Sequence, residues 1–278
     1  MPIKNQLMLL CLLATMLSGC ASKADQSGGN AAPVLSEQTA ATPSAVPSSS
    51  PSPEPAASAA PEPAAEAKIL YRMNEVYRFV PLDESAPKKA VLLTFDDGPK
   101  EEKLINSLFD TLDKHSAKAI FFVNGYRIKA NPELLKLIHE RGGTIGNHSY
   151  DHINLKNEEK AVVEEQLSGV QEMVMELTGE TPKFFRPPFG AGGDTVKEIA
   201  KNHGMLFMTW SNGSLDWDSS ARDKPEVVIK NVMEQLHPGA NILMHELPWT
   251  AEALDELLGK IEAEGYTFID PATIQLTN

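Results

Sequence analysis

Cysteine is nearly absent from this 278-residue chain, whose two cysteines, Cys11 and Cys20, both lie within the first twenty residues. The long remainder of the chain therefore forms no disulfide bond and offers no thiolate to a metal, so its fold must depend on a large apolar core. Basic residues are outnumbered, because 25 Lys and Arg stand against 38 Asp and Glu, a formal net charge of −13. An acidic chain without a basic stripe is not expected to bind nucleic acid or an anionic membrane face.

Two adjacent acids, Asp96 and Asp97, follow the apolar run 90–95 and precede a Gly-Pro pair. Neighbouring side chains at the end of a strand point to opposite sides. One carboxylate can therefore hold a metal ion while the other acts on a water beside it. The same four residues are also typical of a plain turn, so this interpretation needs support from elsewhere in the chain.

Two histidines, His148 and His152, come four residues apart, just after a segment at 142–147 that is predicted to leave the core as a strand. At this spacing they would fall on one side of a helical turn and share an ion, although such pairs also occur by chance on exposed helices. One Asp with two His makes a three-ligand site that leaves a coordination position open. This is the pattern of catalytic zinc or a similar divalent ion.

Three further motifs lie at or just past short apolar runs: FRPPFG at 185–190, LDW at 215–217 and ILMH at 242–245. Together with TFDDGP at 94–99 and HSYDH at 148–152, they resemble, in the same order, the five motifs of the polysaccharide deacetylases of carbohydrate esterase family 4, which share the NodB homology domain. The resemblance extends from about residue 88 to the C-terminus.

The resemblance implies that Asp97, His148 and His152 are the ligands of a divalent metal, Zn²⁺ first, with Co²⁺, Ni²⁺ or Mn²⁺ as alternatives. It also implies that Asp96 is the general base and that Arg186 orients it and pairs with its charge. A guanidinium neighbour keeps a carboxylate ionised, which suits a base. Without the other motifs, Arg186 would be an ordinary exposed arginine at a rigid turn.

His245 would be the general acid, kept cationic by Asp216, so that it can protonate the departing amine. The backbone N–H of Phe189 would stabilise the oxyanion, which in comparable sites is worth about 3–4 kcal/mol. Trp217 and Phe189 would contact the sugar. Taken alone, His245 and Trp217 would instead be interpreted as core residues.

Three positions depart from the family pattern. Phe189 stands where many members have Tyr, Gly213 where many have an acid, and Glu246 where Asp is usual. The proposed oxyanion donor is a main-chain N–H, so the first change removes a phenol contact and leaves the chemistry. These departures bear on substrate preference rather than on the reaction class.

The N-terminus carries an apolar run at 7–17, preceded by Lys4 and too short to cross a bilayer, which is typical of a secretory signal peptide. It ends in LSGC at 17–20, which resembles a bacterial lipobox. This implies cleavage after residue 19 and lipidation of Cys20, which would anchor the protein on the extracellular face of the bacterial cell membrane. The alternative is a chance cleavage site with an unmodified cysteine.

Residues 20–67 are Ala, Ser and Pro with few large apolar side chains, so they cannot form a core. We therefore predict a signal peptide at 1–19, a disordered lipid-anchored linker at 20–67 and a catalytic domain at 68–278. At about 3.1 Å per residue the tether would span at most on the order of 140 Å. That length suits an enzyme reaching into a surface polymer, and an inert spacer would have the same composition.

Apolar runs alternate with helical patterns along 68–278. This alternation predicts an α/β fold with a parallel sheet, and the candidate site residues follow strands, as in a barrel-type active site. About seven strands indicate a distorted or incomplete (β/α) barrel in a single domain, with 68–82 adding a short strand or cap. The expected strands are 90–95, 119–123, 144–145, 184–185, 206–210, 241–244 and 266–269, and the expected helices are 102–115, 132–141, 158–178, 195–203, 225–236 and 251–264.

The sequence thus predicts a metal-dependent hydrolase that removes N-acetyl groups from amino sugars of a cell-surface polysaccharide, peptidoglycan or a related N-acetylglucosamine polymer, and releases acetate. We expect it to be a monomer. One alternative is a catalytically silent relative that binds glycan, and another is a metal-dependent amidase acting on a small non-sugar substrate. N-acetylglucosamine, N-acetylmuramic acid and chitin-type substrates all fit the motifs.

Overall fold

The computed structural model describes residues 67–277. The predicted signal peptide, Cys20 and nearly all of the predicted linker lie outside the described residues. Among the described residues, no helix combines the length and the apolar composition that crossing a membrane requires.

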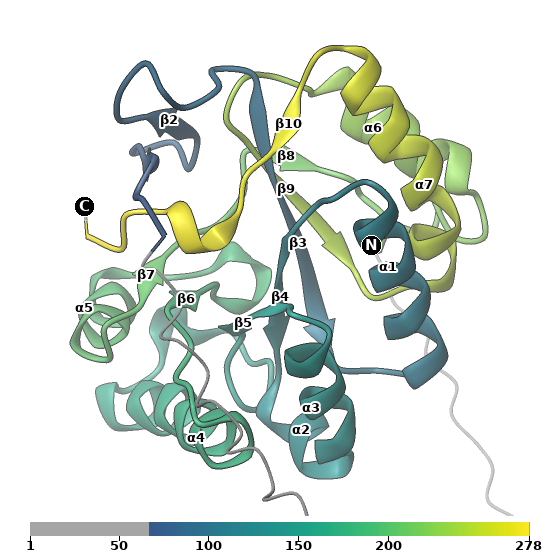
Figure 1. Cartoon of the computed structure of the whole chain (residues 1–278). Helices are drawn as coiled ribbons and strands as arrows, with labels where there is room; N and C mark the ends of the chain where they lie inside the picture. Colours follow the sequence, from purple (N-terminus) through teal and green to yellow (C-terminus); the bar gives the residue numbers. More distant parts are fainter. Residues whose placement is uncertain (1–66, 278) are drawn as a thin grey trace, which may run out of the picture. The chain divides into compact units, whose positions relative to one another are not determined.

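A curled parallel sheet forms the centre of the domain (Figure 1). Seven strands follow one another in the order β7-β6-β5-β4-β3-β9-β8, each parallel to its neighbours, and β10 pairs in parallel with the start of β3. The predicted incomplete α/β barrel is therefore confirmed as a half-barrel. The strands are β3 (Ala90–Gly98), β4 (Ala119–Val123), β5 (Thr144–Asn147), β6 (Phe184–Phe185), β7 (Leu206–Phe207), β8 (Asn212–Gly213), β9 (Ala240–His245) and β10 (Thr267–Phe268).

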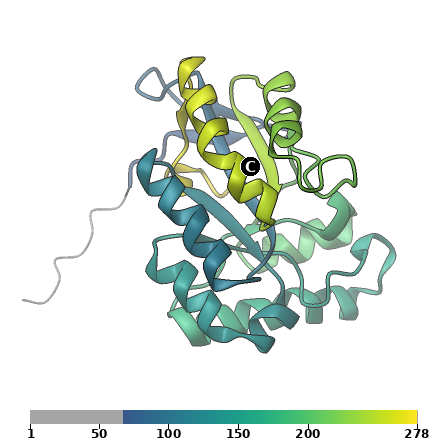
Figure 2. The same ribbon diagram turned by 90° about the vertical axis from the view of Figure 1, so that its right-hand side faces the viewer.

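Seven α-helices of the described chain pack around this sheet (Figures 1 and 2). Proline at the first turn starts α3, α6 and α7, where its missing N–H costs nothing. Gly179 ends α4 in the left-handed conformation. The helices are α1 (Glu102–Lys114), α2 (Gly125–Ala130), α3 (Pro132–Glu140), α4 (Lys160–Thr178), α5 (Asp194–Asn202), α6 (Pro225–Glu234) and α7 (Pro248–Ala263).

Two short elements were not expected from the sequence. Strand β8 has two residues, and helix α2 has six. Neither is long enough to show a hydrophobic period, so only the backbone pairing of β8 with β9 reveals the strand. All of the helices and strands that were expected are confirmed, although β7 ends at Phe207 and is shorter than predicted.

A small antiparallel hairpin of β1 (Tyr71–Met73) and β2 (Phe79–Pro81) forms the cap expected at 68–82. It is tied to the sheet where Gly239 accepts a hydrogen bond from Phe79 N–H and donates one to Ala90 O. A side chain at Gly239 would meet the carbonyl oxygen of Phe79 at 1.9 Å, so this close approach requires glycine.

Alternation along β3 explains the direction of the first candidate acid. Leu93 and Phe95 belong to the cluster that includes buried residues of α1 and α7, whereas Leu92 belongs to a second cluster with the β1–β2 hairpin. Because side chains of a strand alternate, Thr94 and Asp96 follow Leu92 and point away from those helices, into the curl of the sheet. The fold therefore brings Asp96 to the inside of the half-barrel.

Candidate active site

The predicted site residues gather at the carboxyl ends of the central strands. Asp96 and Asp97 end β3, His148 follows β5, Arg186 follows β6, and His245 ends β9. All of these except Arg186 line a cavity of about 410 Å³. Its lining consists of Asp96, Asp97, His148, His152, Pro187, Phe189, Gly190, Trp210, Trp217, Leu243 and His245.

Asp97, His148 and His152 form a compact triangle. Their ligand-type atoms all lie within 4.8 Å of one another, and Nε2 of His152 and of His148 lie 3.1 and 3.5 Å from Asp97 Oδ1. That oxygen is buried without a hydrogen-bond partner. Burial raises the pKa of Asp97, but the two imidazoles outweigh burial and hold this pKa well below its usual value. These three residues could hold a divalent cation, which would satisfy the orphaned oxygen.

The tautomer of His148 suits such a cation. Its Nδ1 lies 2.7 Å from the carbonyl oxygen of Arg186, which can only accept a hydrogen bond. Nδ1 therefore carries a proton, and Nε2 is the nitrogen that faces Asp97. A ring nitrogen held by a carbonyl is a common way to fix a metal-binding histidine.

The segment between the two histidines is not helical, so the expected helical turn is wrong. Ser149 and His152 instead have positive φ angles of 67° and 55°. Asn124 Nδ2 donates to the carbonyls of His148 and Ser149, at 2.8 and 3.3 Å, and His152 N–H donates to Ser149 Oγ at 3.2 Å. This irregular turn still brings both imidazole rings to Asp97, with their centroids 5.0 Å apart.

Asp96 and Arg186 form a buried ion pair. Arg186 is completely buried and its Nη1 lies 2.7 Å from Asp96 Oδ1. Nη1 also donates to Thr94 Oγ1, while Nη2 donates to Thr209 O and Asn241 Oδ1. Burial lowers the pKa of Arg186 and Asp96 partly offsets this, and an arginine stays charged. The guanidinium thus holds one carboxylate oxygen of Asp96, and the other lies 3.7 Å from His148 Nε2.

His245 and Asp216 form a second pair, and His245 lies beside Asp96 in the register of β9 against β3. Asp216 Oδ1 lies 2.8 Å from His245 Nδ1, and Oδ2 accepts from His245 N–H and Thr250 Oγ1, both at 2.7 Å. Burial lowers the pKa of His245, but the hydrogen bond and charge of Asp216 outweigh it and raise this pKa above the usual value. With Nδ1 bound to Asp216, Nε2 is the nitrogen left for the cavity.

Two aromatic side chains form an exposed rim. Phe189 is 66% exposed and its ring meets that of His152 edge-on, with centroids 4.8 Å apart. Trp217 is 45% exposed and lies edge-on to His245, with centroids 5.1 Å apart. Trp217 therefore lines the cavity rather than the core. Phe189 has a positive φ of 60°, which turns the chain sharply after its two prolines.

The sequence missed part of the cavity wall. Trp210 stacks edge-on to Trp217 with centroids 6.5 Å apart, and Leu243 lies in the wall just before His245. The one available signal was the position of Trp210 at the end of an apolar run. Gly190, with φ of 64°, leaves room for Trp210, since a Cβ there would lie 3.0 Å from its ring.

Two family departures have clear structural surroundings. Glu246 is fully buried, burial raises its pKa to about 7, and its Oε2 accepts a hydrogen bond from Lys100 N–H at 2.9 Å. A Cβ on Gly98 would lie 1.9 Å from Glu246 Oε1, so glycine at 98 and glutamate at 246 fit together. Gly213 lies beside Trp210 and Trp217, and a Cβ at this position would lie 3.5 and 3.8 Å from their rings, which is ordinary van der Waals contact.

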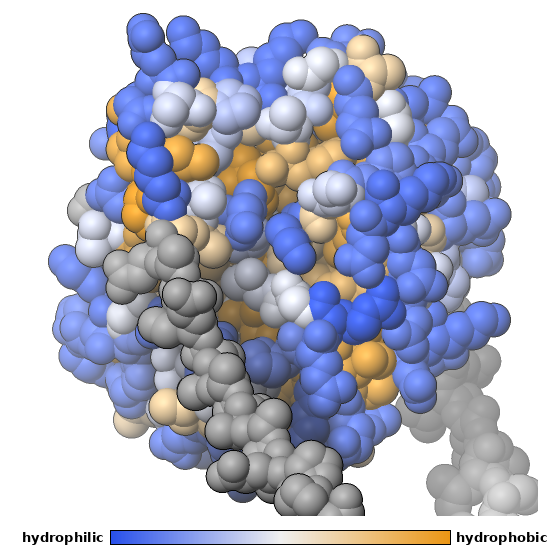
Figure 3. Space-filling view, viewed as in Figure 1, coloured by the Kyte–Doolittle hydropathy of each residue, from blue (hydrophilic) through white to orange (hydrophobic). Residues whose placement is uncertain are grey.

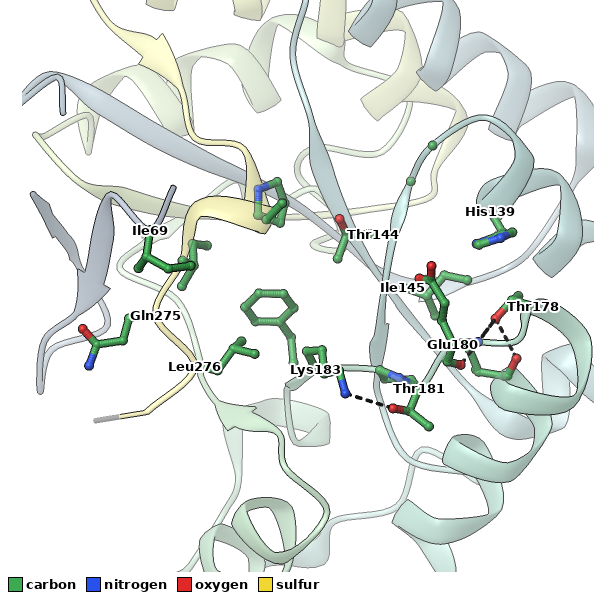
Figure 4. Close-up of a pocket in the computed structure, with 18 residues that line it drawn as sticks. Ile69, His139, Thr144, Ile145, Thr178, Glu180, Thr181, Lys183, Gln275 and Leu276 are labelled. Carbon is green, nitrogen blue, oxygen red and sulfur yellow. Dashed lines mark hydrogen bonds between the residues drawn. The ribbon is translucent and has the colours of Figure 1, made fainter. Parts of the chain in front are cut away.

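A larger cavity, of about 650 Å³, lies at the amino ends of β5 and β6 (Figure 4). Ile69, Thr144, Phe184 and Leu276 are among the residues that line it, and none of the predicted site residues does. Apolar residues in recesses between hydrophilic ones are also visible on the face seen in Figure 3. The larger cavity is therefore not the one that the sequence motifs predict.

Comparison with known proteins agrees with this geometry. A family model described as polysaccharide deacetylase matches residues 83–208, which include the two acids, the two histidines and Arg186 and end before Asp216 and His245. The chain is 33% identical to the peptidoglycan-N-acetylmuramic acid deacetylase PdaA of Bacillus subtilis, over 65% of this chain and 69% of that protein.

A second sequence relative and a solved structure are also similar to the chain. Identity to the peptidoglycan-N-acetylglucosamine deacetylase PgdA of Listeria monocytogenes is 34% over 69% of this chain, which spans only 41% of that longer protein. A crystal structure of a Bacillus anthracis pseudoenzyme of carbohydrate esterase family 4 matches with a TM-score of 0.62 and 34% identity, over 65% of this chain and 63% of that one. By sequence, fold and site together, the chain belongs to the polysaccharide deacetylase family.

Proposed function

We propose that this protein is a metal-dependent hydrolase that removes N-acetyl groups from the amino sugars of a cell-surface polysaccharide, peptidoglycan or a related N-acetylglucosamine polymer, and releases acetate. One observation carries the proposal. The orphaned oxygen of Asp97 faces two imidazole nitrogens, directly beside the carboxylate of Asp96 that Arg186 holds. A ligand triangle next to a separately paired acid is the arrangement that hydrolysis of an amide needs.

Asp97, His148 and His152 would hold the ion. Two imidazoles and one carboxylate favour Zn²⁺, while Co²⁺, Ni²⁺ and Mn²⁺ accept the same donors. When bound, such an ion supplies Lewis acidity that polarises a carbonyl and lowers the pKa of water. Three protein ligands leave room for water and substrate.

The remaining residues move protons and stabilise charge. Asp96, oriented by Arg186, accepts a proton from the attacking water, and His245, charged by Asp216, donates one to the departing amine nitrogen. The C–N bond of the acetamide breaks, acetate leaves with the new oxygen, and the sugar keeps a free amine. The N–H of Phe189 is proposed to stabilise the oxyanion, a contribution of about 3–4 kcal/mol in comparable sites.

The exposed rim favours a sugar substrate, because Phe189 and Trp217 offer faces on which a pyranose ring can stack. The printed activities of PdaA and PgdA support peptidoglycan, with N-acetylmuramic acid in one and N-acetylglucosamine in the other. We further propose export, a lipid anchor at Cys20 on the extracellular face of the cell membrane, and action as a monomer.

A catalytically silent glycan-binding relative is the second candidate, since one 34% identical relative is a pseudoenzyme. The complete set of acid, base and ligand positions in this chain favours activity. A metal-dependent amidase of small non-sugar substrates is the third candidate, and the exposed aromatic rim favours a sugar instead.

The test offers the purified chain, with Zn²⁺, to N-acetylglucosamine polymers, peptidoglycan and chitin oligomers, and measures acetate and free amine. We expect equal amounts of both from at least one glycan, loss of turnover with a chelator, and recovery when Zn²⁺ is restored. Glycan binding without acetate release would favour the silent relative. Release from small acetamides alone would favour the amidase.

A further inference from the structure

A buried glutamine on α4 faces the turn that carries the two histidines. Gln166 is 6% exposed, and its Oε1 accepts a hydrogen bond from Asp151 N–H at 2.8 Å. Its Nε2 donates to Asp151 Oδ2 at 2.7 Å. One amide side chain therefore holds both the backbone and the side chain of the residue that directly precedes His152.

This turn needs support from outside itself. Positive φ angles at Ser149 and His152 cost of order 1–3 kcal/mol each, and such residues persist only where the surroundings over-determine them. Asn124 holds the carbonyls of His148 and Ser149, and the hydroxyl of Ser149 accepts from His152 N–H across the turn. The two bonds to Gln166 hold Asp151, which lies between Ser149 and His152.

Helix α4 is a firm base for that contact. Val163, Leu167 and Val170 are completely buried on the side of α4 that also carries Gln166, so the helix cannot shift without opening the core. Asp151, by contrast, is exposed. Its carboxylate would be free in water if Gln166 did not hold it, and a hydrogen bond to an ionised carboxylate is among the stronger ones.

We propose that Gln166 is a positioning residue that sets His152 against Asp97 and thereby raises the affinity of the site for its metal. The inference rests on the proposed ligand set of the proposed function. Gln166 does not line the cavity, so it acts through the turn and not on the substrate. Outer residues that orient ligands typically change metal affinity by 10–100-fold.

The test reverses the hydrogen-bond polarity of the pair. Gln166→Glu keeps the size and the acceptor for Asp151 N–H, but it replaces the Nε2 donor by an oxygen that faces Asp151 Oδ2. We expect Zn²⁺ affinity, measured by chelator competition, to fall about 10–100-fold, with a changed visible spectrum of the Co²⁺ form. Asp151→Asn alone keeps an acceptor for Gln166 and should bind nearly as the unaltered chain.

Rescue is the decisive result. In the Gln166→Glu/Asp151→Asn double variant, a new amide donor faces the new carboxylate, so affinity and Co²⁺ spectrum should return. Val163→Ala is the matched control, because it removes a buried group from the same helix and leaves both hydrogen bonds between Gln166 and Asp151 in place. Should Gln166→Glu not fold, Asp151→Ala, at an exposed position, removes the same Nε2 bond and should weaken Zn²⁺ likewise.

The outcomes separate this inference from the proposed function. If the unaltered chain binds no metal, the proposed ligand set fails. If the unaltered chain binds Zn²⁺ and Gln166→Glu binds it equally well, or if the double variant shows no recovery, the role of Gln166 is overturned. An equal loss of affinity in Val163→Ala would mean that general destabilisation, and not positioning, lowers the affinity.

Discussion

Strands β5 and β6 run between two cavities that differ in chemistry. At their carboxyl ends, His148 lines a cavity of about 410 Å³ together with Asp96, whose carboxylate the buried Arg186 holds from behind the wall. At their amino ends, Thr144 and Phe184 line about 650 Å³. The larger space is lined by apolar side chains and by half-buried or exposed polar ones, whereas the smaller one combines apolar side chains with two acids and three imidazoles.

The two basic residues on either side of β6 differ in burial in the same way as the two cavities differ in chemistry. Lys183 is exposed and donates to Thr181 Oγ1, as a surface lysine does at almost no cost. Arg186, three residues later, is completely buried and needs Asp96, Thr94, Thr209 and Asn241 to satisfy it. A buried ion pair is weak evidence for stability, so its position beside the ligand triangle marks this end of the sheet as the functional one.

The largest expected effect is a difference in Zn²⁺ binding and deacetylation between variants of two histidines. His152→Ala removes a proposed ligand and should abolish both stoichiometric Zn²⁺ binding and deacetylation, whereas His139→Ala, in the wall of the larger cavity, should preserve both. Metal content after dialysis and acetate release measure this contrast. If His152→Ala retained stoichiometric Zn²⁺, the cavities at the carboxyl and amino ends of the strands would no longer differ in metal binding.

The next effect is on stability. Arg186→Leu leaves Asp96 buried without its partner, and removing one member of a buried pair costs about 3–5 kcal/mol. Lys183→Leu changes an exposed residue and should stay within about 0.5 kcal/mol of the unaltered chain. Chemical denaturation of both variants checks the comparison, and equal midpoints would contradict the energetic difference between the two ends of the sheet.

The pH dependence of activity is expected to come from His245 in the smaller cavity. Asp216 raises the pKa of His245, so the acid stays protonated to a higher pH than an unpaired imidazole, and activity is lost as pH rises through this raised value. Stability from the pair follows the same sign, since it is complete below the usual pKa of about 6.5 and fades above it. Asp216→Asn removes the charge and keeps the burial, so the basic limb of kcat/KM at saturating Zn²⁺ should move to lower pH. A limb that does not move would show that another group sets it.

The smallest effect is expected at the amino ends. Leu276 is 39% exposed beside the larger cavity, and Leu276→Gln should change neither Zn²⁺ affinity nor kcat/KM. A substantial loss of deacetylation in this variant would show that the larger cavity takes part in the reaction.

Local sequence patterns predicted much of this architecture correctly. Apolar runs revealed β3, β4 and β9 because buried strands of five or more residues leave a clear signal, and the charged motifs at their ends showed which residues meet at the carboxyl edge. The two-residue strand β8 gives no such signal. The turn at 148–152 was misjudged because its shape depends on Asn124, which lies on a neighbouring segment and is invisible to local spacing.

The same limit applies to the cavity walls. Trp210 and Leu243 become wall residues only when the sheet curls, and Gln166 meets Asp151 only when α4 packs beside the turn. The residues that do the proposed chemistry could therefore be named from sequence, whereas the residues that shape and hold the site required the fold.

The central claim is that two adjacent acids have separate tasks, and parallel measurement of metal content and turnover in Asp96→Asn and Asp97→Asn tests it most directly. We predict that Asp96→Asn retains stoichiometric Zn²⁺ and loses about 10²–10⁴ in kcat, as expected for removal of a general base. Asp97→Asn should lose metal and turnover together. Loss of metal in Asp96→Asn, or an active, metal-loaded Asp97→Asn, would contradict the account.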